Sequence, residues 1–206
     1  MVDFKLTEQQ LMLRDLARRF VQEEVIPVRA ELDRKADPRE GFSWELLRKA
    51  DAVGLRTLAL KEEDGGIDSD IITRCVVGEE LATGDLGFAV CLDQIWKISG
   101  AIVKLCNEEQ QKRFIPLFRD DPECVLSIGI TEPSGGSNYM PPMERKETIQ
   151  TRAELKGDEW VINGSKCFVS NAGLSKIYLV FALTDPDKPF YERFSAFLVT
   201  SDAPGF

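Results

Sequence analysis

The residues best suited to do chemistry lie in a polar turn that follows an apolar run. The run, residues 125–130, ends at Thr131, and a proline, two glycines and flanking serines follow. Such a turn presents backbone N–H groups and small hydroxyls at the end of a strand, where a polar ligand can bind the main chain. An ordinary surface turn has the same composition, so the turn alone favours neither interpretation. The full stretch reads Ile130-Thr131-Glu132-Pro133-Ser134-Gly135-Gly136-Ser137-Asn138.

A second polar segment follows farther along the chain. Its Asn163-Gly164 pair predicts a two-residue hairpin turn of type I′, which requires positive φ at both central positions. A strand is expected over residues 166–170, with Phe168 and Ser170 on one face. For a lone phenylalanine, a place in the core is the simpler explanation. The segment reads Trp160-Val161-Ile162-Asn163-Gly164-Ser165-Lys166-Cys167-Phe168-Val169-Ser170-Asn171.

Apolar residues recur at helical spacing throughout the first 122 residues. The helices that they predict must position part of any site. Thr7 to Gln10 has the form of a capping box. A second helix follows Ser43, with Leu46, Leu47, Ala50 and Val53 expected inward and Gly54 as its stop. Further helices are expected over residues 69–83 and 86–106, and from Asn107 onward.

The period of the apolar pattern falls to two after residue 122. We therefore predict a multi-domain α+β protein, with an all-α domain over 1–122 and a small antiparallel β-barrel over 123–206. Gly157-Asp158 marks one turn, and a cleft between the two lobes is a common place for a cofactor. The expected strands are 125–131, 149–155, 159–162, 166–170, 177–183 and 194–200.

Composition excludes several classes of function. The chain has 206 residues, 35 acidic against 26 basic, and a net charge of -9, so a general nucleic-acid surface is not expected. It has no histidine, which removes histidine-based triads, bases and metal sites, and we predict no metal. The five cysteines are dispersed, as in a reducing compartment. We expect no membrane span and no signal peptide, and cytoplasm is the default, with a mitochondrial matrix as the alternative.

Taken together, the two polar segments resemble the acyl-CoA dehydrogenase family. The family pattern is Thr-Glu-Pro-x-x-Gly-Ser-Asp, followed by Asn-Gly-x-Lys, an aromatic residue, an apolar residue and a Thr or Ser. Both segments are present in this order, although Asn138 stands where Asp is usual and Phe168 where Trp is common. The likeness extends over the whole chain. It implies FAD as cofactor and α,β-dehydrogenation of an acyl-CoA thioester, with proton loss from the α-carbon and hydride transfer from the β-carbon to flavin N5.

The resemblance also assigns roles to individual residues. It implies that the Thr131 hydroxyl and the backbone near Ile130 and Gly136 bind the pyrimidine edge of the flavin, and that Ser137 reaches the cofactor or the substrate. Phe168 would pack on the isoalloxazine and Ser170 would approach N5. On the long helix, Asp93 and Trp96 would line the acyl pocket. The plainer alternatives are a solvated helix face for Asp93 and core packing for Trp96.

The family's catalytic carboxylate usually lies in a C-terminal four-helix domain that has no counterpart in these 206 residues. We therefore name no catalytic residue and expect this chain alone to be inactive. The resemblance implies acyl-CoA as substrate, electron-transfer flavoprotein as electron acceptor, and a homotetramer or a hetero-oligomer with a second chain. Two alternatives stay open. One is a superfamily oxidase, reductase or monooxygenase. The other is a non-catalytic or split subunit that completes the FAD or CoA site of a partner.

Overall fold

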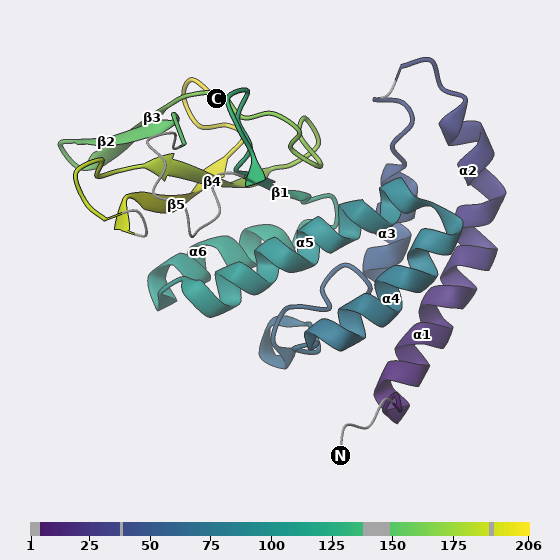
Figure 1. Ribbon diagram of the computed structural model, residues 1–206. Coiled ribbons are helices and arrows are strands. Elements are labelled where there is room, and N and C mark those ends of the chain that lie inside the picture. The colour runs from purple at the N-terminus through teal and green to yellow at the C-terminus, as the bar shows by residue number, and fades with distance from the viewer. Residues whose placement is uncertain (1–4, 38, 138–148, 190–191) are drawn as a thin grey trace. The chain divides into compact units, whose positions relative to one another are not determined.

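The computed structural model describes residues 5–37, 39–137, 149–189 and 192–206. It divides the chain into two compact units, unit 1 over Met1–Cys124 and unit 2 over Val125–Phe206 (Figure 1). Unit 1 is helical and unit 2 is built on a β-sheet. The predicted order of a helical region followed by a β region is confirmed.

Side-chain caps define where most helices of unit 1 begin. Thr7 and Asn107 each form a capping box with a glutamine three residues later, and Ser43 accepts a hydrogen bond from the Leu46 N–H. These caps satisfy backbone donors that have no partner inside the helix. The helices are α1 (Glu8–Phe20), α2 (Ile26–Asp33), α3 (Trp44–Ala52), α4 (Ile71–Gly84), α5 (Leu86–Leu105) and α6 (Glu108–Arg119), with a 3-10 turn at Glu62–Asp64.

A π-helical turn, η1 (Val21–Val25), joins α1 to α2. Pro27, in the first turn of α2, has no N–H to donate, and the helix widens immediately before it. The C-terminal end of α4 packs closely on this turn, since a Cβ added at Gly84 would lie 2.8 Å from the Val21 Cγ1 atom. A glycine is therefore needed where α4 meets η1. Beyond this contact, α1 packs on α4, α4 on α5, and α5 on α6.

Helix α5 is the central element of the core of unit 1. By length and composition α5 is apolar enough to cross a membrane, which the sequence pattern had not led us to expect. More than half of that apolar stretch is buried inside the structure, as in the core helix of a helical bundle. Trp96 is 1% exposed, and its indole N–H donates to the Leu55 carbonyl at 2.7 Å. On α3 the predicted inward residues are buried except Val53, which is 42% exposed because it follows the last helical residue.

A buried arginine ties the end of α6 to α3. The Arg56 side chain is fully buried and forms an ion pair with Asp51, Nε to Oδ1, at 2.7 Å. Its guanidinium also donates to the Phe118 carbonyl at 3.0 Å and the Arg119 carbonyl at 3.2 Å, and it lies 4.3 Å from the centre of the Phe118 ring. One side chain thus satisfies the last carbonyls of α6 and cross-links two helices.

The sheet of unit 2 has mixed strand directions. Its strands are β1 (Leu126–Gly129), β2 (Arg152–Lys156), β3 (Glu159–Asn163), β4 (Ile177–Leu183) and β5 (Phe194–Thr200). β5 pairs antiparallel with β4 along its whole length, whereas β1 runs parallel to β4 from Leu126↔Ile177 to Gly129↔Val180. β2 meets the end of β4 in parallel at Arg152↔Leu183 and forms an antiparallel hairpin with β3.

Two details of the predicted β domain are wrong, and its closure into a barrel stays a prediction. The parallel β1–β4 pair contradicts a wholly antiparallel sheet, and the strand pairs within the described residues do not close a ring. No strand forms over 166–170, so no hairpin forms at Asn163-Gly164. The turn at Gly157-Asp158 is confirmed as the β2–β3 hairpin turn, with Gly157 at φ 63°. That hairpin packs on β5 through the rings of Trp160 and Phe197, whose centres are 5.4 Å apart.

We predict that Arg56→Met lowers the free energy of unfolding of unit 1 by about 3 kcal/mol, because it leaves Asp51 and the α6 carbonyls without their buried partner. Urea unfolding followed by helical circular dichroism measures this change. Arg39→Met is the matched control, because Arg39 pairs with Asp37 at the surface, and it is expected to leave stability unchanged. Equal effects of the two substitutions would contradict the role assigned to Arg56.

Candidate ligand-binding loops of unit 2

The polar turn after β1 is closed by its own backbone. The Glu132 N–H donates to the Gly135 carbonyl at 2.9 Å, and the Gly135 N–H donates back to the Glu132 carbonyl at 3.0 Å. Pro133 lies at the centre of this tight turn, as the sequence predicted. Beyond it, a Cβ added at Gly136 would lie 3.5 Å from Thr131 Cγ2, so Gly136 lies against the Thr131 side chain. Within the described residues, the Thr131 hydroxyl has no hydrogen-bond partner.

The carboxylate of Glu132 points inward and accepts four hydrogen bonds. Oε1 accepts from the Thr151 N–H at 2.9 Å, the Thr151 hydroxyl at 2.6 Å and Lys166 Nζ at 2.8 Å, and Oε2 accepts from the Gln150 N–H at 2.6 Å. The Glu132 side chain is 3% exposed and that of Lys166 is 11% exposed. A buried carboxylate is tolerated when it is paired and fully hydrogen-bonded, as it is here. Glu132 thereby joins the polar turn to the chain that enters β2.

Lys166 and its neighbour hold the backbone of Thr131 from the other side. Lys166 Nζ donates to the Ile130 carbonyl at 3.2 Å, and the Cys167 N–H donates to the Thr131 carbonyl at 2.9 Å. The two carbonyls that flank Thr131 Cα are therefore both bonded to the second polar segment. The two motifs, widely separated in sequence, lie side by side in unit 2.

Burial and hydrogen bonding shift the pKa values of Glu132 and Lys166 in opposite directions. Burial raises the pKa of Glu132, but hydrogen bonds from Lys166, Thr151 and Gln150 outweigh it and hold this pKa below its ordinary value. Burial lowers the pKa of Lys166, and the bond to Glu132 opposes that shift. Glu132 is therefore ionised in the folded protein at neutral pH.

Residues 166–171 run along β1 without forming a regular strand. The Ser127 hydroxyl donates to the Ser170 carbonyl at 2.6 Å, and the Asn171 side-chain amide donates to the Leu126 carbonyl at 3.1 Å. Side chains thus supply the bonds that a backbone ladder would make. Because residues 166–170 form no strand, the backbone can turn at Phe168, which has φ 53° and a side chain that is 94% exposed. Phe168 and Ser170 lie on one loop rather than on one face of a strand.

The glycine of the Asn163-Gly164 pair is required for a reason beyond the positive φ that was predicted. A Cβ at Gly164 would lie 2.4 Å from the Thr151 hydroxyl oxygen and 2.6 Å from Thr151 Cα. Only a residue without a side chain fits against the threonine that donates to Glu132. The glycine signal was correct: Gly164 has a positive φ of 159°, and it also packs closely on Thr151.

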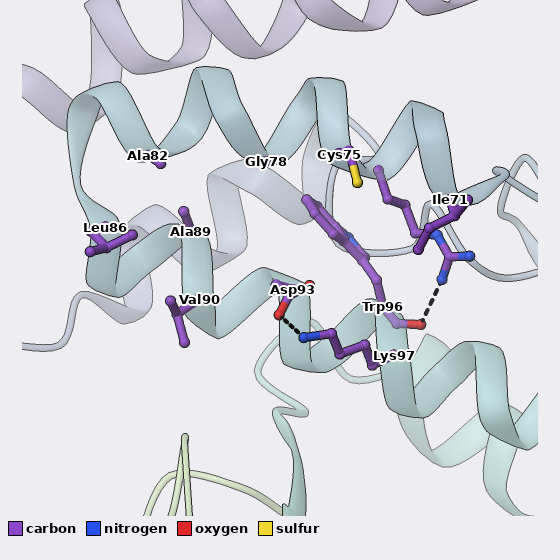
Figure 2. A pocket seen from close by; sticks show the side chains of 11 residues that line it. Ile71, Cys75, Gly78, Ala82, Leu86, Ala89, Val90, Asp93, Trp96 and Lys97 are labelled. Atoms are coloured by element: carbon purple, nitrogen blue, oxygen red, sulfur yellow. Dashed lines mark hydrogen bonds and ion pairs between the residues drawn. The ribbon is translucent and has the colours of Figure 1, made fainter.

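The two residues predicted for an acyl pocket belong to unit 1. Asp93 and Trp96 line a surface groove of about 240 Å³ between α4 and α5, with Cys75 and Lys97 among its other walls (Figure 2). The Asp93 carboxylate pairs with Lys97 one turn along the helix. Although Trp96 lines the groove, its indole is buried and bonded to Leu55. Core packing of Trp96, the alternative stated above, is what the structure shows.

The structure thus brings most of the predicted residues of the β region together. Ile130, Thr131 and Gly136 lie in the turn after β1, and the chain that precedes Phe168 and Ser170 is bonded to that turn. Ser137 is exposed at the end of the turn, and Asn138 lies outside the described residues. Within the described residues, no cluster of three His, Cys, Asp or Glu side chains gathers to hold a metal ion.

Sequence reasoning assigned no role to the residues that hold the loops in place. These residues are Glu132, Lys166, Thr151, Ser127 and Asn171. One signal was available, because Glu132 and Lys166 carry opposite charges and each follows an apolar or small-residue stretch. Because buried charges are paired, a Glu and a Lys in two motifs that are expected to meet are candidates for such a pair.

Comparison with known proteins identifies both units. The model of the acyl-CoA dehydrogenase N-terminal domain matches residues 7–120, and that of the acyl-CoA dehydrogenase middle domain matches residues 127–206. The short-chain specific acyl-CoA dehydrogenase of Clostridium acetobutylicum is 31% identical over 207 residues, which cover 100% of this chain and 51% of that protein. The chain spans about half the length of the curated relatives it matches.

Solved structures agree with these matches. A chain in the structure of the electron-transferring flavoprotein of Acidaminococcus fermentans is 31% identical, with a TM-score of 0.82 over 99% of this chain and 50% of that one. The acyl-CoA dehydrogenase of Bacillus anthracis, solved in complex with FAD, is 28% identical, with a TM-score of 0.80 over 100% of this chain and 32% of that one.

We predict that Gly164→Ala destabilises unit 2 by about 2 kcal/mol, because the added methyl group overlaps Thr151 and the backbone has a positive φ. The free energy of unfolding in urea measures this effect. Gly157→Ala is the control, since its added methyl meets nothing within 4 Å. Gly157→Ala is expected to lower the free energy of unfolding only by the strain of a left-handed backbone, about 1 kcal/mol. A smaller loss for Gly164→Ala than for the control would refute the packing argument.

The lowered pKa of Glu132 predicts a pH dependence of stability. The ionised carboxylate stabilises the fold fully above the ordinary pKa of 4.5, and this contribution is lost as pH falls through the lower folded-state pKa. Wild type should therefore exceed Glu132→Gln in unfolding free energy at pH 7, and the difference should shrink below pH 4.5. Urea titrations at several pH values test this. Glu154→Gln, at an exposed pair with Lys156, should show no such difference, and a constant gap for Glu132→Gln would contradict the assignment.

Proposed function

Because this chain belongs to the acyl-CoA dehydrogenase family, we propose that it forms the flavin-contacting part of an FAD-dependent acyl-CoA dehydrogenase. The family is a flavoprotein oxidoreductase family, and it acts on acyl-CoA. The observation that carries the proposal is the state of Thr131. Its flanking carbonyls are both bonded, while its hydroxyl has no partner among the described residues.

The residues of the two loops fit the edge of a flavin ring. A flavin needs hydrogen-bond donors at its pyrimidine edge and a flat apolar surface near its ring. The Thr131 hydroxyl can donate at the end of β1, and the backbone at Ile130 and Gly136 lies beside it. Phe168, 94% exposed on an anchored loop, offers an aromatic face of the kind that otherwise lies in a core. Ser170 follows on the same loop.

When bound, FAD would supply the acceptor for the hydride that leaves the β-carbon of the acyl thioester. The part of this chain is to orient the cofactor and to stabilise negative charge at its pyrimidine edge. Donors fixed before the reaction, such as the Thr131 hydroxyl, stabilise such charge without having to reorganise. Ser137, exposed at the end of the turn, is proposed to contact the cofactor or the substrate. No proton transfer is assigned to a residue of this chain.

For the substrate, we propose that the groove between α4 and α5 contributes to acyl binding through Asp93. The Asp93 side chain is 41% exposed, so it can offer a polar group. Trp96 contributes an apolar, buried side chain to the lining of the groove. Electron-transfer flavoprotein is the proposed electron acceptor, which the matched structure from Acidaminococcus fermentans supports.

We predict that Thr131→Val weakens FAD binding by about three- to tenfold, the loss of one hydrogen bond to the cofactor. Valine keeps the methyl group that faces Gly136 and removes only the hydroxyl. Isothermal titration of the purified chain with FAD measures the affinity. Thr83→Val, which removes a hydroxyl on α4 that bonds to the Glu80 carbonyl, is the control and should bind FAD as wild type does. An unchanged affinity for Thr131→Val would remove Thr131 from the site.

A further inference from the structure

The Glu132–Lys166 pair joins three separate segments of unit 2 at one buried point. Glu132 belongs to the turn after β1, and Thr151 belongs to the chain that enters β2. Lys166 belongs to the loop that carries Phe168. The carboxylate makes two bonds to Thr151 and one to Lys166, at 2.6–2.9 Å. No two of these segments are adjacent in sequence, so the pair fixes their spacing.

Stability alone does not account for an ion pair at this position. Removing two charges from water costs free energy that their mutual attraction offsets only in part, so a buried pair is weak evidence for stabilisation. What a buried pair does supply is one defined geometry, because each donor and acceptor is satisfied in a single arrangement. The role of the Glu132–Lys166 pair therefore lies in the groups that it holds in position.

The pair sets the orientation of the backbone at Thr131. Lys166 Nζ donates to the Ile130 carbonyl at 3.2 Å while it also bonds Glu132. In a planar trans peptide the N–H points opposite to the C=O, so the Thr131 N–H points away from Lys166. The Cys167 N–H holds the Thr131 carbonyl at 2.9 Å. Both peptide planes around Thr131 are thus fixed by two consecutive residues.

The same two residues form one of two anchors of the Phe168 loop. Lys166 and Cys167 attach the loop to the turn just before Phe168, and the Ser127 hydroxyl attaches it to β1 just after, through the Ser170 carbonyl at 2.6 Å. Between these anchors Phe168 keeps a left-handed backbone at φ 53°, a conformation that costs free energy for a bulky residue. Loss of the first anchor would let the loop relax from this conformation.

We propose that Glu132 and Lys166 are positioning residues, which set the orientation of Thr131 and Phe168 relative to each other for one ligand held between their loops. The proposal rests on the proposed function, in which that ligand is the isoalloxazine part of FAD. Neither charged group needs to touch the flavin. The pair acts through the Ile130 carbonyl and through the backbone that leads to Phe168.

The test compares the charge-neutral double variant Glu132→Gln/Lys166→Met with wild type and with the single variants. The double variant leaves no buried charge alone, and the amide oxygen that it introduces at position 132 can still accept from Thr151. It should therefore be more stable in urea than either single variant. FAD affinity, measured by titration of each purified chain, should nevertheless stay about tenfold below wild type, because the bond to the Ile130 carbonyl is lost. Lys156→Met, at an exposed pair, is the matched control with wild-type affinity.

The outcomes separate a positioning role from a structural one. If FAD affinity in the double variant returns to wild type along with stability, the pair is only structural and the proposal fails. If wild type itself does not bind FAD, the proposed function fails, and the positioning role is judged by amide hydrogen exchange. Exchange at the Cys167 N–H should then be about tenfold faster in the double variant than in Lys156→Met. Equal exchange rates would overturn the proposal.

Discussion

Unit 2 depends on one interaction, the buried pair between Glu132 and Lys166. The polar turn after β1, the chain entering β2 and the loop that carries Phe168 are each bonded, directly or through the next residue, to that pair. A charge at 3% exposure requires several partners, and the partners come from three parts of the chain. The requirement to satisfy one carboxylate therefore determines how the polar turn, the chain entering β2 and the Phe168 loop are placed.

The sequence predicted what local rules control. The capping box at Thr7, the helix start at Asn107 and the turn at Gly157 depend on residues within a few positions of each other, and the structure confirms them. The motif at Thr131 also folds as the tight turn that Pro133 and the glycines indicate. The order of helices before strands followed from the change in apolar period.

Errors arose where a distant partner replaced a local one. Residues 166–170 alternate as a strand does, but Ser127 and Asn171 side chains take the place of ladder bonds, and the backbone is free to turn at Phe168. Gly164 has a positive φ but lies in no hairpin, and the approach of Thr151 also excludes a side chain there. The parallel pairing of β1 with β4 likewise depends on segments far apart in sequence. Rules that use only neighbouring residues cannot predict partners that lie far away in the sequence.

The central claim is that the two loops joined by Glu132 and Lys166 form the flavin site. Titration of the isotope-labelled chain with FAD, followed by amide chemical shifts, tests it most directly. The account predicts that the largest shifts fall on the amides of residues 130–132, 134–136 and 167–170, with Thr131 and Phe168 among them. Saturable FAD binding whose shifts spare both loops and concentrate on another part of the chain would contradict it.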